Sequence, residues 1–179
     1  ANPSGKCGDN AYWEFDPATG VLSITGSGDM YDYATLSAVP FDSYKTKITS
    51  VKVAEGITSI GDRAFQNAPV TSVALPSTLK DIGNQAFYGT KLTSVSIPNA
   101  VTAIGDGAFE GTSITGVKLP SSLKVIGASA FKDTPLTSLT VPASVTNIGE
   151  AAFSSDESST KLTAIVFEGA PPSIGAYTF

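Results

Sequence analysis

The chain of 179 residues contains no histidine, a single cysteine and a single arginine. Without imidazole, it lacks the side chain that most often serves as a general base or a zinc ligand. Cys7 can form no internal disulfide, and as a nucleophile it would lack an imidazole partner. The 16 acidic residues are scattered along the chain rather than paired for glycoside hydrolysis. We therefore expect no enzyme: no catalytic residues, no metal site and no cofactor.

Charge and long apolar runs are also scarce. Charged residues make up 15% of the chain, below the usual share of about 25%. The 11 basic and 16 acidic residues leave a net charge of −5, which disfavours nucleic acid as a partner because phosphate binding needs clustered cations. No apolar run approaches the roughly 20 residues of a membrane span. The start, ANPSGKCGDN, lacks the basic and apolar regions of a signal peptide, and is interpreted either as a mature end after cleavage or as a trimmed start.

A short repeat organises most of the sequence. An Ile-Gly pair begins at Ile60, Ile82, Ile104, Ile126, Ile148 and Ile174, so the period is constant except for one longer interval before the last pair. A phenylalanine follows each of these isoleucines by five positions: Phe65, Phe87, Phe109, Phe131, Phe153 and Phe179. Six units at a nearly fixed period are typical of a solenoid, in which each unit buries its apolar residues only against its neighbours.

Each unit predicts a short strand, a corner and a turn. The opening strings are rich in Val, Ile and Thr, as strands are; the predicted strands are 48–53, 70–75, 92–97, 114–119, 136–141 and 162–167. Proline ends four of them, the recurrent glycine predicts a corner, and the Ala-Phe step predicts one helical turn. Equivalent strands one coil apart should be parallel, with right-handed crossovers, and should lie in one sheet. We expect Phe87, Phe109 and Phe131 to be buried and stacked along the solenoid.

The unit L-T-S-V-x-I-P-x-x-V-x-x-I-G-x-x-A-F resembles the BspA-like leucine-rich repeat of bacterial surface and secreted proteins. The resemblance covers residues 48–179, and it departs from the commoner leucine-rich pattern because proline stands where asparagine usually follows the strand. The segment 7–33 also resembles the region often found ahead of such arrays. The resemblance implies a right-handed leucine-rich-repeat solenoid, an extracellular or cell-surface location and a role in adhesion or host contact.

The two ends of the chain differ from the repeat. Residues 1–47 are predicted to form an N-terminal cap, and 48–179 the six-repeat solenoid. In the cap, AYWEF (11–15) and VLSIT (21–25) flank a turn-rich spacer and predict a β-hairpin. Its aromatic residues either seal the stack or offer a platform for sugar rings, and Cys7 is either a packed cap residue or a thiol for metal or intermolecular bonding.

At the C-terminus the sixth unit carries no polar cover, which solenoids normally need. The array therefore either continues in a longer protein, is naturally this short, or has its last coil covered by a second copy through self-association. The polar insertion at 154–161 is either a solvated bulge or a local binding feature.

The outward strand positions carry mostly small residues, poor in the Tyr, Trp and Arg of tight interfaces. We expect a non-enzymatic module for adhesion or binding of an extracellular protein or glycan; the alternative is a structural stalk or a carbohydrate-contacting spacer. The candidate contacts are Tyr31 and Tyr33 in the cap and the strand-face cations Lys52 and Lys118. The competing interpretation is that the lysines keep the sheet face soluble and the tyrosines close the cap.

Overall fold

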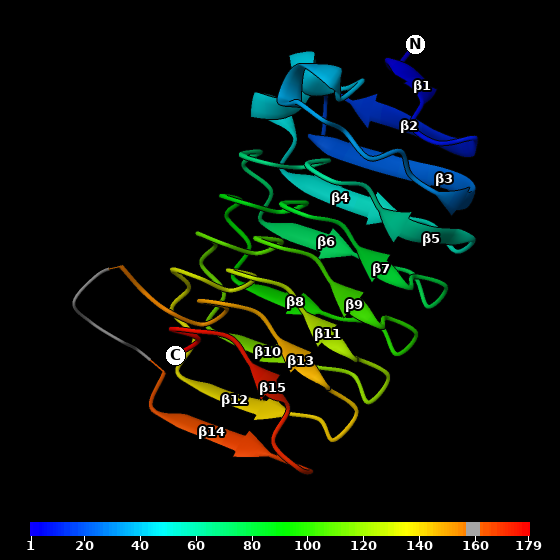
Figure 1. Cartoon of the computed structure of the whole chain (residues 1–179). Coiled ribbons are helices and arrows are strands. Elements are labelled where there is room, and N and C mark those ends of the chain that lie inside the picture. Colours follow the sequence, from blue (N-terminus) through cyan, green and yellow to red (C-terminus); the bar gives the residue numbers. More distant parts are fainter. Residues whose placement is uncertain (157–161) are drawn as a thin grey trace.

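The computed structural model describes residues 1–156 and 162–179. It is a β-solenoid whose coils stack in sequence order from an N-terminal hairpin (Figure 1). Successive coils are in parallel register, for example Ser50 opposite Ser72 and Ser94 opposite Gly116. The predicted solenoid, with equivalent parallel strands one repeat apart, is therefore confirmed.

The first file of strands lies within the predicted ranges. It consists of β4 (Ser50–Val53), β6 (Ser72–Ala74), β8 (Ser94–Ser96), β10 (Gly116–Lys118), β12 (Ser138–Val141) and β14 (Ala164–Phe167). These strands lie one above the other along the solenoid (Figure 1). Their alternating burial matches the β period, with central residues such as Val51 and Leu139 inside the core.

The expectation that this file forms one sheet is wrong. Among the described strands, β4 pairs with β6, β8 with β10 and β12 with β14, while no register pair joins β6 to β8 or β10 to β12. Several of these strands span only three residues.

A second file of strands, not predicted from the sequence, forms the continuous sheet. It consists of β5 (Ile57–Ile60), β7 (Asp81–Ile82), β9 (Ala103–Ile104), β11 (Val125–Ile126), β13 (Asn147–Ile148) and β15 (Ser173–Ile174). All its neighbours pair in parallel. Each strand ends on the isoleucine of the Ile-Gly pair, and the glycine then permits close approach: a Cβ at Gly105 would lie 2.6 Å from the backbone nitrogen of Asn84.

The helical turn predicted at the Ala-Phe step is wrong. The residue two positions before the phenylalanine has a positive φ, as at Gln85 (54°) and Ser129 (57°). Its N–H bonds the next coil, and so does that of the phenylalanine: the N–H of Phe109 donates to the carbonyl of Ala130 at 2.8 Å. A third line of backbone bonds thus runs between coils where a helix would have bonded along the chain.

The N-terminal hairpin is confirmed and is continuous with the solenoid. Strand β1 (Ser4–Lys6) pairs with β2 (Asn10–Asp16), which pairs antiparallel with β3 (Val21–Asp29). The short 3₁₀ helices η1 (Leu36–Ala38) and η2 (Asp42–Lys47) follow. Strand β3 pairs with β4 through its first half and with β5 near its end, so one strand begins both files. The division of the chain at 47/48 stays a prediction.

A column of stacked phenylalanine rings fills the core. The predicted rings Phe87, Phe109 and Phe131 are fully buried, with centroids 5.5 and 5.3 Å apart. In the described part of the chain the column begins one ring earlier than the repeat predicts, because Phe41 stacks on Phe65 at 5.6 Å. Phe41 precedes Phe65 by slightly more than one repeat, and no Ile-Gly pair stands ahead of it. The repeat pattern therefore did not distinguish it from the other aromatic residues of the cap.

Candidate functional site

The outward side of the first strand file forms an exposed face of small side chains. Its exposed members include Lys52, Ser72, Ala74, Ser94, Ser96, Gly116, Lys118, Ser138, Thr140, Ala164 and Val166. The residues between them point inward and join the core. The face therefore has little relief, because most of its side chains are small. Lys52 and Lys118 carry the positive charge that was predicted for it.

Lys52 and Lys118 occupy the same position of their strands, the third residue of β4 and of β10. Both are exposed. They stand three coils apart, which corresponds to roughly 14 Å at the usual strand spacing. A partner that contacts both must therefore span several coils of the solenoid.

Tyr31 is exposed but lies away from the lysines. It follows the end of β3, where its carbonyl faces Gly61 at the end of β5. Its side chain is 43% exposed. The hydroxyl donates to Asp9 Oδ1 at 3.0 Å, and this hydrogen bond to a carboxylate raises the pKa of the phenol. Lys52, in contrast, pairs with Ser23 in the first half of β3. Tyr31 and Lys52 therefore lie near opposite ends of that strand.

Tyr33 is buried, with 6% of its surface exposed. Its hydroxyl donates to the carbonyl of Cys7 at 3.4 Å, and burial raises its pKa above the ordinary value. A side chain held in the core in this way closes the cap and offers no surface to a partner. The four predicted residues therefore do not form one cluster.

Tyr12 is an exposed aromatic that the sequence reasoning did not single out. Its side chain is 45% exposed, and Lys6 Nζ lies 5.9 Å from the ring centroid. Across β3, the register pairs Glu14 with Ser23 and Ser23 with Lys52, so Tyr12 and Lys52 lie on the same side of the sheet. The signal was present in AYWEF, whose alternation turns Trp13 inward and Tyr12 outward.

A groove of about 370 Å³ opens in the strand face between β10 and β12. It is lined by Gly116, Val117, Lys118, Leu119, Ser138, Leu139, Thr140, Pro142 and Glu168. It coincides with one of the two interruptions of the strand ladder. The predicted residue Lys118 thus lies at a concave part of the face, whereas Lys52 lies between strands that are paired.

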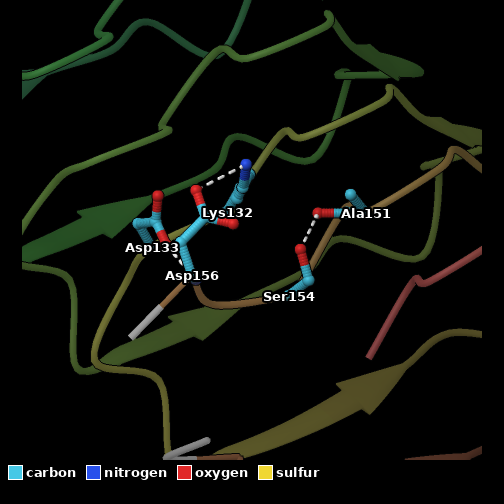
Figure 2. Close-up of polar contacts among 5 residues, drawn as sticks. All are labelled: Lys132, Asp133, Ala151, Ser154 and Asp156. Atoms are coloured by element: carbon cyan, nitrogen blue, oxygen red, sulfur yellow. Dashed lines mark hydrogen bonds and ion pairs between the residues drawn. The ribbon is translucent and has the colours of Figure 1, made fainter. Parts of the chain in front are cut away.

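The insertion after the fifth phenylalanine is anchored at its start. Figure 2 shows Lys132 Nζ forming an ion pair with Asp156 Oδ2 at 2.9 Å. The N–H of Asp156 donates to Asp133 Oδ1 at 2.8 Å, and Ser154 Oγ donates to the carbonyl of Ala151 at 3.2 Å. The hydrogen-bonded ion pair raises the pKa of the Lys132 ammonium group. Residues 157–161 of the predicted bulge or binding feature lie outside the described residues.

Within residues 1–156 and 162–179, no three His, Cys, Asp or Glu side chains are grouped closely enough to hold a metal ion. In the same part of the chain, no helix is long and apolar enough to cross a membrane.

Cys7 is expected to be unreactive in the folded protein. Its side chain is fully buried, and burial raises the pKa of the thiol to about 12, so little thiolate is present at pH 8. We expect an aromatic disulfide reagent to label native protein far more slowly than protein unfolded in urea. Rapid labelling of the native protein would show that the thiol is accessible and would support the alternative interpretation of Cys7.

The comparison with protein families decides the identity of the repeat. A model described as a BspA type leucine rich repeat region matches residues 40–160 with six copies. The chain belongs to the BspA-type leucine-rich-repeat family. The family match begins ahead of the predicted boundary at residue 48 and includes Phe41, in agreement with the position of that ring in the column.

Solved structures of leucine-rich-repeat proteins share the fold of this BspA-type chain. A leucine-rich repeat protein from Eubacterium ventriosum is 32% identical, with a TM-score of 0.77 over 83% of this chain and 40% of its own. The leucine rich repeat protein of T. pallidum is 20% identical, with a TM-score of 0.69 over 93% and 86%. A leucine rich cell surface protein from Faecalibacterium prausnitzii is 24% identical, with a TM-score of 0.58 over 95% and 56%.

The BspA-type chain thus spans less than half the length of the Eubacterium protein. A search of curated proteins finds no match.

Proposed function

We propose that this chain is a non-enzymatic interaction module at the cell surface or outside the cell, which binds a partner protein in adhesion or host contact. The observation that carries this proposal is the exposed strand face, on which small side chains recur from coil to coil. Membership of the BspA-type family supports the location and the role.

The proposed contacts are Lys52 and Lys118 on the strand face, with Tyr31 as an additional contact on the flank. Small side chains let a partner approach the backbone, and the two cations favour an acidic partner surface. Such exposed charges contribute modestly and are screened by salt. Adhesion through several weak contacts therefore suits the face better than a single tight site.

Glycan and host-matrix protein arrays test this proposal. We expect wild-type protein to bind an acidic protein component at low salt, with a signal that fades as salt increases. The double variant Tyr31→Ala/Lys52→Glu should lose most of that signal. Equal binding by both proteins at low salt would rule out these contacts.

A carbohydrate-contacting stalk or spacer is the second candidate function. It is favoured by one observation, the exposed ring of Tyr12 with the Lys6 ammonium 5.9 Å from its centroid, because exposed tyrosines combine an apolar face with a polar edge. Binding restricted to glycans on the same arrays would favour it over protein adhesion.

Self-association through the last coil stays a proposal, and sedimentation at increasing protein concentration tests it.

A further inference from the structure

A groove lies in the strand face over the interruption between β10 and β12. Among the described strands, β10 pairs with β8 and β12 with β14, and no register pair crosses from β10 to β12. The two strands remain close neighbours, so the groove is a hollow in the face and not a gap that would admit a further strand. Its volume of about 370 Å³ lies within the usual size range of ligand sites, about 300–1,000 Å³.

The groove has an apolar base and a polar margin. Val117 and Leu139 line it from the inward positions of the two strands, and both pack in the core. Ser138 and Thr140 are exposed at its margin and supply hydroxyl groups. Gly116 adds no side chain, so a bound chain can approach the backbone of β10.

Two opposite charges also line the groove. Lys118 ends β10, and Glu168 directly follows β14. Neither forms an ion pair with any residue in the described ranges 1–156 and 162–179. Glu168 lies two coils and two residues from Lys118 in the strand register, where Thr140 pairs with Val166; their Cα atoms are therefore roughly 12 Å apart.

We propose that this groove binds an extended peptide segment of a partner protein, with an acidic side chain at position i and a basic one at i+2. Residues i and i+2 of an extended chain face the same side, about 7 Å apart. The acidic side chain would pair with Lys118 and the basic one with Glu168, whose long side chains cover the remaining distance.

The inference rests on the proposed binding of a protein partner and adds its chemical class and its place. It also supplies a matched control. Lys52 occupies on β4 the position that Lys118 occupies on β10, but β4 is paired on both sides, with β3 and β6. If positive charge in general attracts the peptide, charge reversal at either lysine should weaken its binding. If the groove binds the peptide, only reversal at Lys118 should weaken it.

Fluorescence anisotropy with a labelled, end-blocked peptide Ser-Glu-Thr-Lys-Ser tests the groove at low salt. We expect wild-type protein to bind, and Lys118→Glu and Glu168→Lys each to weaken binding about tenfold, as charge reversal in a close pair does. Lys52 is a proposed contact for the whole partner protein, but it lies three coils from Lys118 and outside the groove. Lys52→Glu should therefore leave the affinity of this short peptide within about twofold. The double variant Lys118→Glu/Glu168→Lys should prefer the reversed peptide Ser-Lys-Thr-Glu-Ser.

Three results would overturn the groove site: absence of peptide binding by wild type, equal binding of the uncharged peptide Ser-Gln-Thr-Gln-Ser, or an equal loss with Lys52→Glu. All three substituted side chains are exposed, and circular dichroism checks that the variants fold. If the arrays detect a partner protein but the peptides do not bind, the groove fails and the proposed function stands. If the peptides bind with the expected Lys118 dependence but the arrays detect no protein, the groove stands and the broader proposal fails.

Discussion

Phe109→Ala is expected to destabilise the protein by about 3–5 kcal/mol, the range for removing a fully buried aromatic ring. The side chain is 0% exposed, and its ring stacks on Phe87 at 5.5 Å and on Phe131 at 5.3 Å. The backbone bonds between coils hold these neighbours at the coil spacing, so the space left by the ring cannot close. Urea unfolding, with the m value compared between variants, measures the loss.

The end of the same column provides the control. Phe179 is 43% exposed and, within residues 1–156 and 162–179, stacks on one ring, that of Phe153, at 5.8 Å. Phe179→Ala should therefore reduce the free energy of unfolding by at most about half as much as Phe109→Ala, since the cost follows burial. A loss below about 1 kcal/mol for Phe109→Ala would contradict the buried column.

Gly105→Ala is expected to destabilise the protein by about 3 kcal/mol or more, at the upper end for added core volume. A Cβ at this position would lie 2.6 Å from the backbone nitrogen of Asn84 and 2.7 Å from the carbonyl carbon of Gly83. Both contacts are with the backbone of the preceding coil, so no side chain can move aside. Relief requires the two coils to separate, which weakens the pairing of β7 with β9. Thermal and urea unfolding measure the effect.

Gly116→Ala is the matched substitution on the other strand file. No heavy atom lies within 4 Å of a Cβ built at Gly116. Alanine there should be neutral or stabilise the fold by about 0.4–1 kcal/mol, because it lowers the entropy of the unfolded chain. If Gly105→Ala and Gly116→Ala unfold at the same urea concentration, close packing between coils does not explain the repeated glycine.

The first strand file was predictable because each strand has a local sequence pattern. The strings around Val51, Val95 and Leu139 alternate apolar and small residues, and this alternation sets both the strand and its inward side. The repeat then fixes the register, since equivalent residues of a solenoid stack on one another. The pairing interruptions were not predictable, because the strings that form β10 and β12 follow the same repeat as the strings of the paired strands.

The second strand file and the turns were missed for different reasons. Strands such as β7 and β9 span two residues, too short for any period to be recognised. The positive-φ position of the turn carries Arg63, Gln85, Gly107, Ser129, Ala151 and Tyr177. Only one of these residues is the glycine that normally marks such a backbone. The bonds to the next coil impose this conformation, so the sequence of one unit does not reveal it.

For the candidate contacts, the alternation of inward and outward residues along a strand predicted exposure better than residue type did. Tyr31 and Tyr33 were grouped because their segment is polar, yet one is exposed and the other buried. Tyr12 is exposed because it alternates with the inward Trp13 and Phe15. The exposure of Lys52 and Lys118 followed from the same alternation. The groove beside Lys118 required the structure, since it depends on Glu168, two coils away.

Strand β3 has a consequence for how the chain is assembled. Its first half pairs with β4 and its end with β5, and its own hairpin partner β2 precedes it in the sequence. The residues that form both edges therefore precede the first coil in the sequence. Translation delivers the N-terminus first. Each new coil can therefore pair with strands that were synthesised before it. The hairpin thus offers a pairing edge to both strand files, and the order of synthesis is also the order in which the coils stack.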